Sequence, residues 1–164
     1  MRHYDEARSI PAPAADVFAL IDDHTRLSAH MSKSSWMMGG GKMDIATDEG
    51  RGQRVGSHIK LSGTAFGIGI FLDEVVTAHD PPRRKVWETV GIPKLLIIGR
   101  YKMEVTITPQ ANVSILRVGI DYEPLETFLG VVFGYPYAKW CVRRMLNDAS
   151  AHFALPGQRP VPAQ

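Results

Sequence analysis

Residues 136–153, PYAKWCVRRMLNDASAHF, decide the fold, because they are the longest amphipathic helix that the chain can form. One side of this helix carries side chains at the spacing of three or four residues that marks a single helix face. They are Ala138, Cys141, Val142, Met145, Leu146, Ala149, His152 and Phe153. Lys139, Arg143, Asn147 and Ser150 take the other side. Such a helix needs an apolar surface to cover, and the segments before it must supply that surface.

Strand-like segments fill most of the chain before the helix. We predict a strand over residues 2–10, a helix from 13 to 22–23, a second short helix over 24–31, and about six consecutive strands from 43 to 122. Alternation is clear in Val55, Ser57, Ile59, Leu61, in Tyr101, Met103, Val105, Ile107, and in Leu116, Val118, Ile120, Tyr122. Residues 91–93 read as a connection between strands. Short connections make antiparallel neighbours, so the pattern predicts an α+β fold in which a curved antiparallel sheet of about six or seven strands wraps around the C-terminal helix.

Length and charge limit the class of protein. The 164 residues suit a single domain, expected over residues 1–155, followed by a disordered, proline-containing tail over 156–164. The formal net charge of +2 argues against a nucleic-acid binder, and no cofactor motif is evident. The start of the chain lacks an apolar signal core, and the apolar stretch 128–137 is far short of the roughly 20 residues that span a bilayer, so we expect a cytoplasmic protein without a transmembrane segment.

Metal and phosphate sites are not predicted. His24 and His30 lack the spacing of a helical zinc pair, and no carboxylate completes a site. The glycines at 39–41 followed by Lys42 do not make a phosphate loop, because such a loop requires glycine where Trp36 stands and Ser or Thr where Met43 stands. We interpret the glycines as a bend that opens a strand.

Catalytic candidates are few. Asp73 and Glu74 point to opposite faces of a strand, so they cannot act as a pair, and we expect them on a solvated edge. His152 can be read as a buried general base or as a cation that caps the helix C-terminus. Cys141 is expected to be buried and inert. No catalytic residue is therefore assigned.

Several motifs, in their order and spacing, resemble those of the START-like superfamily, also called SRPBCC, with its polyketide cyclase/dehydrase and lipid-transport branches. The matching segments are IPAPAADVFALID at 10–22, VGS at 55–57, EV at 74–75 followed by DPPRR at 80–84, and YEPL at 122–125. The resemblance covers roughly residues 2–153. It implies a helix-grip fold with an internal cavity, and members that bind lipids, sterols, polyketides or other apolar molecules, some of them cyclases, aromatases or hydrolases. The superfamily shares no universal catalytic motif.

The predicted binding site is the set of side chains that face inward between sheet and helix. Either these residues bind a hydrophobic small molecule or they are simply core. Tyr101 and Tyr122 are the better candidates, because a buried phenol needs a partner and can orient a ligand. The set comprises Ile59, Leu61, Tyr101, Met103, Val105, Leu116, Val118, Tyr122, Val142, Met145 and Leu146.

Three functions remain open at this stage. The first is a binding or transport protein for a lipid, polyketide or aromatic-like molecule. The second is a cyclase or dehydratase that uses Tyr101, Tyr122 and His152 to orient substrate and move protons. The third is an interaction protein, a homodimer or a partner subunit, that uses Trp140 and residues 128–135.

Trp140 and residues 128–135 do not fit a simple pocket. Trp140 is expected opposite the apolar stripe, on another element or on a partner surface. The stretch 128–135, FLGVVFGY, is too apolar for an ordinary loop. It is an extra turn of covered helix, a lid over the cavity mouth, a dimer contact or a membrane-dipping segment.

Overall fold

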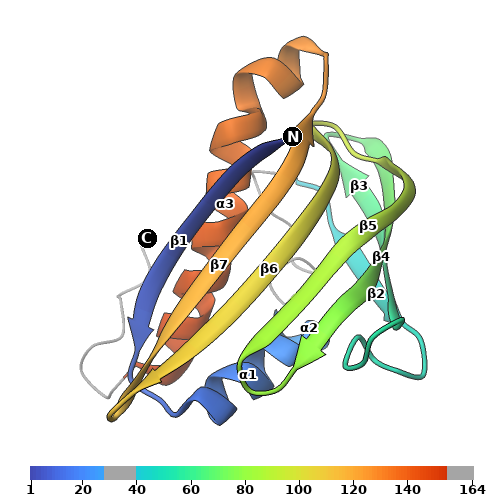
Figure 1. Ribbon diagram of the computed structural model, residues 1–164. Coiled ribbons are helices and arrows are strands. Elements are labelled where there is room, and N and C mark those ends of the chain that lie inside the picture. Colours follow the sequence, from blue (N-terminus) through green and yellow to red (C-terminus); the bar gives the residue numbers. More distant parts are fainter. Residues whose placement is uncertain (28–39, 155–164) are drawn as a thin grey trace.

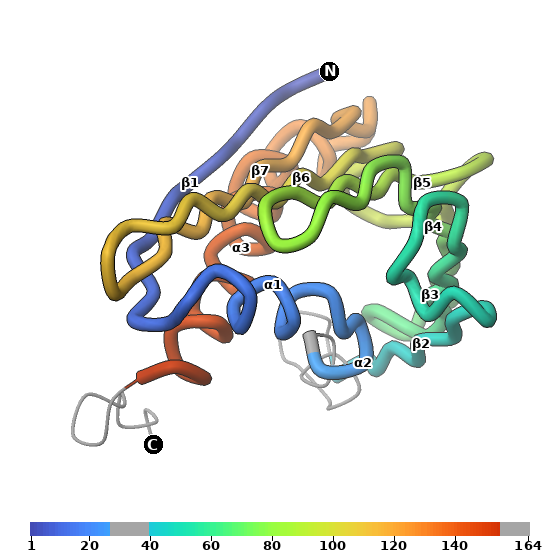
Figure 2. The backbone as a smooth tube through the Cα atoms, turned by 60° about the horizontal axis from the view of Figure 1, so that its bottom comes forward, coloured from blue at the N-terminus to red at the C-terminus, as the bar shows by residue number. Residues whose placement is uncertain are grey.

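The computed structural model describes residues 1–27 and 40–154 of the chain. Its centre is a seven-stranded antiparallel sheet in the order β1-β7-β6-β5-β4-β3-β2. The strands are β1 (Arg2–Ile10), β2 (Met43–Thr47), β3 (His58–Ala65), β4 (Ile68–Asp80), β5 (Arg84–Lys94), β6 (Ile98–Gln110) and β7 (Val113–Pro124). The fold class predicted from the sequence, a curved sheet around a C-terminal helix, is confirmed (Figures 1 and 2).

Three helices complete the described part of the chain: α1 (Ala14–Asp22), α2 (His24–Leu27) and α3 (Phe128–Phe153). Figure 2 shows the sheet bending around α3, with α1 and α2 on the open side of the curve. α3 packs against β1 and β7. The predicted tail at 156–164, and the part of the second helix placed at 28–31, lie outside the described residues.

α3 begins earlier than the sequence pattern indicated. The amphipathic pattern predicts a helix from about Pro136 to Phe153. The helix instead starts at Phe128, where the Thr127 side chain accepts a hydrogen bond from the Gly130 backbone N–H at 3.1 Å, and Pro136 lies inside it. A helix-starting signal was therefore present at Thr127, in the residue type that caps helices.

Two strand boundaries also differ from the prediction. The alternation predicts Val55 on a strand, but β3 starts at His58, because Gly56 takes a positive φ of 84° and the chain is still turning there. The sequence predicts a connection at residues 91–93, but β5 continues through them to Lys94.

The core lies where α3 seats on the sheet. Alternating side chains of β6 and β7, such as Val105 and Val118, meet Ala138, Val142 and Leu146 of the helix, and all five are buried. Among the helices formed by residues 1–27 and 40–154, none combines the length and apolar character that a bilayer crossing needs.

Candidate functional site

A cavity separates α3 from the half of the sheet on which the helix does not seat. Its volume is about 180 Å³, more than ten times the roughly 10–15 Å³ that one water molecule needs. The sheet contributes Met43 and Ile45 of β2, Ile59, Leu61 and Ala65 of β3, Ile70, Leu72 and Glu74 of β4, Trp87 of β5, Ile98, Tyr101 and Met103 of β6, and Ile120 of β7. His24 of α2, the turn residue Phe66 and residues 95–97 add to the wall.

The residues predicted from the sequence divide between this cavity and the core. Ile59, Leu61, Tyr101, Met103 and Met145 line the cavity. The other six, Val105, Leu116, Val118, Tyr122, Val142 and Leu146, are buried in the core. The division follows from the position of α3, which packs on β1 and β7 and leaves a space over β2–β5 and the first part of β6. A role in ligand binding stays a prediction for the first group.

α3 presents a second face to the cavity, beside the face that packs on the sheet. Tyr137, Trp140, Cys141, Arg144 and Met145 line the cavity, at the spacing of three and one residues that marks a helix face. The expectation that Trp140 points to another element or a partner was wrong, because it lines the cavity and stacks near Tyr137, with ring centroids 5.8 Å apart. The spacing of these residues is visible in the sequence, but a charged residue, Arg144, interrupts the apolar pattern by which such a face is recognised.

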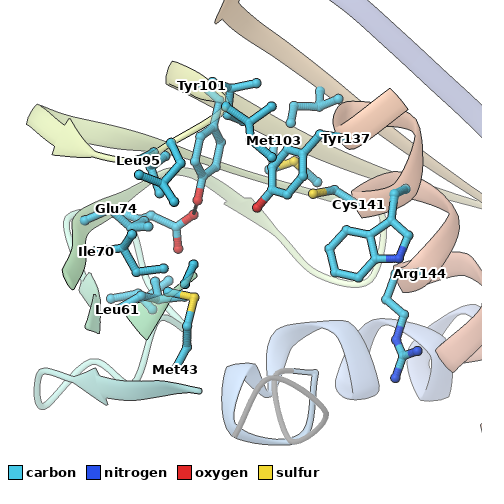
Figure 3. A pocket seen from close by; sticks show the side chains of 18 of the residues that line it. Met43, Leu61, Ile70, Glu74, Leu95, Tyr101, Met103, Tyr137, Cys141 and Arg144 are labelled. Carbon is cyan, nitrogen blue, oxygen red and sulfur yellow. Dashed lines mark hydrogen bonds between the residues drawn. The ribbon is translucent and has the colours of Figure 1, made fainter. Parts of the chain in front are cut away.

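Glu74 is the carboxyl group of the described cavity wall. We expected it on a solvated edge, but it is only 4% exposed. The Tyr101 hydroxyl donates a hydrogen bond to Oε1 of Glu74 (Figure 3). The Trp87 side chain is a further hydrogen-bond partner of this carboxyl. Glu74 is buried because it lies on the same face of β4 as the buried residues Ile70 and Leu72. Asp73 points to the other face, where its carboxylate lies 2.9 Å from Nδ1 of His58.

Burial dominates the electrostatics of Glu74. It raises the pKa of this carboxyl to about 7, although the hydrogen bonds from Tyr101 and Trp87 and the charge of Lys85 act in the opposite direction. The pKa of Tyr101 is also raised well above its usual value, by burial and then by the neighbouring Glu74. A carboxyl with this pKa exchanges a proton near neutral pH.

A buried ion pair lies behind this wall. Lys85 is fully buried, and its Nζ lies 2.6 Å from Oδ1 of Asp22, which also pairs with His79 at 3.0 Å. Burial lowers the pKa of Lys85 despite that partner. His24, edge-on to Trp87, has its pKa lowered to about 3, first by burial and then by the Lys85 charge, so it is neutral at physiological pH.

Comparison with known families gives a match over residues 1–154, to the family described as polyketide cyclase / dehydrase and lipid transport. The chain belongs to this family. Comparison with curated protein sequences gives no match.

Solved structures similar to this family member share its fold at low sequence identity. A Chromobacterium violaceum protein is 16% identical with a TM-score of 0.67, and the match covers 95% of this chain and all (100%) of that one. A Thermobifida fusca protein is 13% identical with a TM-score of 0.67, covering 98% and 99%. A point mutant of norcoclaurine synthase from Thalictrum, in complex with a transition-state analogue, is 13% identical with a TM-score of 0.62, covering 91% of each chain.

Proton-transfer candidates named from the sequence are not brought together in this member of the polyketide cyclase / dehydrase and lipid transport family. Tyr101 lines the cavity, but Tyr122 lies in the core, where its hydroxyl has no hydrogen-bond partner among the described residues. His152 is exposed and packs edge-on against Phe153, so it is not a buried base.

Cys141 is half-buried, not fully buried as predicted, because it lines the cavity, but its high pKa agrees with the expected inert thiol. Burial raises its pKa to about 12, against the hydrogen bond with Tyr137. The pKa of Tyr137 is raised as well, first by Cys141 and then by burial. Within residues 1–27 and 40–154, no group of three or more His, Cys, Asp or Glu side chains could hold a metal ion.

The stretch 128–135 is helical and largely exposed. Only Gly130 and Gly134 are buried there, whereas Phe128 is 78% exposed and its apolar neighbours are about half exposed. Of the four alternatives for this stretch, the extra turn of covered helix is right about the helix, but the rest of the described chain does not cover these turns.

Proposed function

We propose that this protein binds an apolar small molecule in the cavity between α3 and strands β2–β6. The observation that carries the proposal is a cavity of about 180 Å³ whose described wall is mainly apolar and carries a few polar side chains, with Glu74 and Tyr101 on the sheet side and Arg144 on the α3 side. Ligand sites in proteins have this composition, since apolar walls supply affinity and a few polar groups orient the ligand.

The side chains of the wall support binding of a ligand with an irregular shape. Met43, Met103 and Met145 all line the cavity, and methionine adapts to different shapes because it is unbranched and polarisable. Tyr137 and Trp140 offer aromatic surface on the α3 side. Family membership agrees with this function, since the family's description includes lipid transport.

A pair of variants on one strand tests the proposal. Ile70→Trp fills the cavity from β4, whereas Ile68→Trp, on the same strand, replaces an exposed side chain. Binding of a neutral, environment-sensitive naphthalene dye is measured by fluorescence titration. We expect the wild type and Ile68→Trp to bind the dye with similar affinity. Ile70→Trp should bind it at least about tenfold more weakly than the wild type, which corresponds to a loss of about 1.4 kcal/mol in binding free energy.

Tryptophan fluorescence provides a second measurement if Ile70→Trp folds poorly. Trp87 and Trp140 line the cavity. A dye bound there should quench the tryptophan emission of the folded wild type by energy transfer, and the quenching should disappear when the chain is unfolded in urea. Absence of dye binding to the wild type, or equal binding by Ile70→Trp, would reject the proposal.

A second candidate is an enzyme of the cyclase or dehydratase type in the same cavity. It is favoured by Glu74, which has a pKa of about 7 and a hydrogen bond from Tyr101, and can therefore take up and release a proton at neutral pH. The test is conversion of a short poly-β-ketone, followed by mass spectrometry. Glu74→Gln should abolish product formation while dye binding persists, and equal conversion by this variant would exclude the role.

A further inference from the structure

Among the described residues, no cation is paired with Glu74 in the cavity. Its two hydrogen-bond partners, Tyr101 and Trp87, are neutral, and within residues 1–27 and 40–154 no lysine, arginine or histidine forms an ion pair with it. A buried carboxylate is ordinarily paired, because leaving its charge unpaired in an apolar environment costs several kcal/mol.

The cations near Glu74 are paired with other acids. Lys85, on the neighbouring strand, lies 2.6 Å from Asp22. Arg144, on the α3 wall, lies 3.3 Å from Asp148, and Figure 3 shows it across the cavity from Glu74. Asp73 adds a further negative charge near Glu74. His24, which also lines the cavity, is neutral because its pKa is about 3.

The walls next to Glu74 suit a cation. Tyr101 and Tyr137 point into the same space from β6 and α3 (Figure 3), and Trp87 and Trp140 also line it. Aromatic faces attract an ammonium group, and the effect grows when water is excluded. A carboxylate has about four acceptor positions, so the hydrogen bonds from Tyr101 and Trp87 leave room for an ammonium donor.

We propose that the ligand of this cavity is an apolar molecule with a protonated amine, and that Glu74 pairs with the ammonium group. This inference rests on the proposed binding function and names the chemical class of its ligand. A ligand carboxylate would be repelled by Glu74, and a neutral ligand would leave the carboxylate without a counter-charge.

Three probes of equal shape test the inference: naphthylmethylamine, naphthylmethanol and naphthoate, titrated by tryptophan fluorescence or calorimetry. At pH 8 we expect the amine to bind at least about tenfold more tightly than the alcohol and naphthoate to bind most weakly. The amine preference should fall as the pH drops through about 7, where Glu74 takes up its proton. Alcohol binding should change little over the same range.

Glu74→Gln separates the inference from the proposed function. The variant should bind amine and alcohol equally, because glutamine keeps the shape of the side chain and removes its negative charge. If the wild type binds amine and alcohol equally at pH 8, the amine inference fails and the binding function stands. If none of the probes binds, both fail.

A second, independent observation concerns the end of the molecule at which α3 begins. The β3–β4 turn, the end of β5 and the start of α3 all lie at this end, the top of Figure 1. Large apolar side chains are exposed on each of these elements. They are Phe66 and Ile68 at the β3–β4 turn, Ile92 near the end of β5, and Phe128, Leu129, Val131 and Val132 at the start of α3. Val55, at the other end of the sheet, is exposed to a similar degree.

Charge is distributed unevenly at this end. The stretches 61–72 and 127–138 contain no charged residue, and 89–103 contains Lys94, Arg100 and Lys102 but no acid. Glu123 and Glu126 are the acids that precede α3. The first two turns of α3 are apolar on every side apart from their two buried glycines, a pattern that is stable only when the helix is covered by protein or lipid.

We infer that this end docks on a lipid surface, with the start of α3 and the β3–β4 turn in the apolar layer and Lys94 and Arg100 at the headgroups. Three separate projecting elements suit a fluid surface better than an isologous contact with a second copy, which needs one self-complementary patch. Phe66 is both exposed and part of the cavity wall, so the apolar surface is continuous with the cavity.

Vesicle sedimentation tests the docking surface. The probes are phosphatidylcholine vesicles with and without phosphatidylglycerol. The α3 pair is one variant that carries both Phe128→Glu and Val131→Glu, and Val55→Glu is the matched control. We expect wild type and Val55→Glu to sediment with the vesicles, more strongly with the anionic lipid, and the α3 pair to remain in solution. No sedimentation of the wild type overturns the inference. A self-association in ultracentrifugation that the α3 pair abolishes, without vesicle binding, assigns the surface to a second copy instead.

Discussion

Replacing Glu74 by glutamine should stabilise the protein above neutral pH and change little in acid. Glu74 is buried, and its pKa in the folded protein is about 7, compared with its ordinary value of 4.5. Each pKa unit corresponds to about 1.4 kcal/mol, so ionising this carboxyl in the folded state costs about 3 kcal/mol of the free energy of unfolding. Glutamine keeps the shape and removes the charge.

The sign of the pH dependence follows from proton binding. Between pH 4.5 and about 7 the folded protein holds the Glu74 proton more tightly than the unfolded chain, so raising the pH lowers stability through this group. The difference in stability between Glu74→Gln and the wild type should therefore grow across that window. It should reach a plateau of about 3 kcal/mol above pH 7.

Urea unfolding of both proteins at pH 5 and pH 8, followed by circular dichroism, measures this difference. Other titrating groups are common to both proteins and cancel. Glu126→Gln, which changes an exposed glutamate before α3, is the control and should follow the wild type at both pH values. If Glu74→Gln is destabilised equally at pH 5 and pH 8, the carboxylate is stabilising through its hydrogen bonds, and the argument from burial is refuted.

The remaining predictions concern stability, measured by urea unfolding at neutral pH. Gly134→Ala should stabilise the protein by about 0.5–1 kcal/mol, because its new Cβ would lie at an ordinary contact distance of 3.6 Å from the Tyr122 ring. Gly130→Ala should destabilise it, because its Cβ would lie 2.3 Å from the backbone oxygen of Leu125. Equal effects of the two substitutions would contradict a helix that begins at Phe128. Tyr122→Phe should not destabilise, because its buried hydroxyl has no partner among the described residues, and a loss above about 1 kcal/mol would reveal one. Lys85→Met should cost about 3 kcal/mol by leaving Asp22 without its nearest cation, and no loss would show that the pair is dispensable.

The layout of the fold could be predicted from short-range patterns. Alternation in β6 and β7 and the periodicity of residues 138–149 place buried side chains on one face, and the structure confirms both. These patterns depend only on the two-residue and 3.6-residue repeats of strands and helices, so the amino-acid order is sufficient. Boundaries were less accurate where a residue suits two roles, as Pro136 does.

The position of the cavity could not be predicted in the same way. An inward-facing side chain lines a cavity or fills a core according to where the covering helix seats, and that depends on contacts between distant segments. Val105 and Met103 belong to the same alternating strand, yet one lies in the core and the other lines the cavity.

The sequence by itself therefore determined the sheet, the covering helix and the family, because these depend on repeats and motifs along the chain. The tertiary structure alone decided which side chains share the cavity and what charge they carry. Glu74 shows the reason: its place on an apolar strand face is visible in the sequence, but its pKa is set by Tyr101, Trp87 and Lys85, which come from other strands. Desolvation and charge act through space, and only the fold brings those groups together.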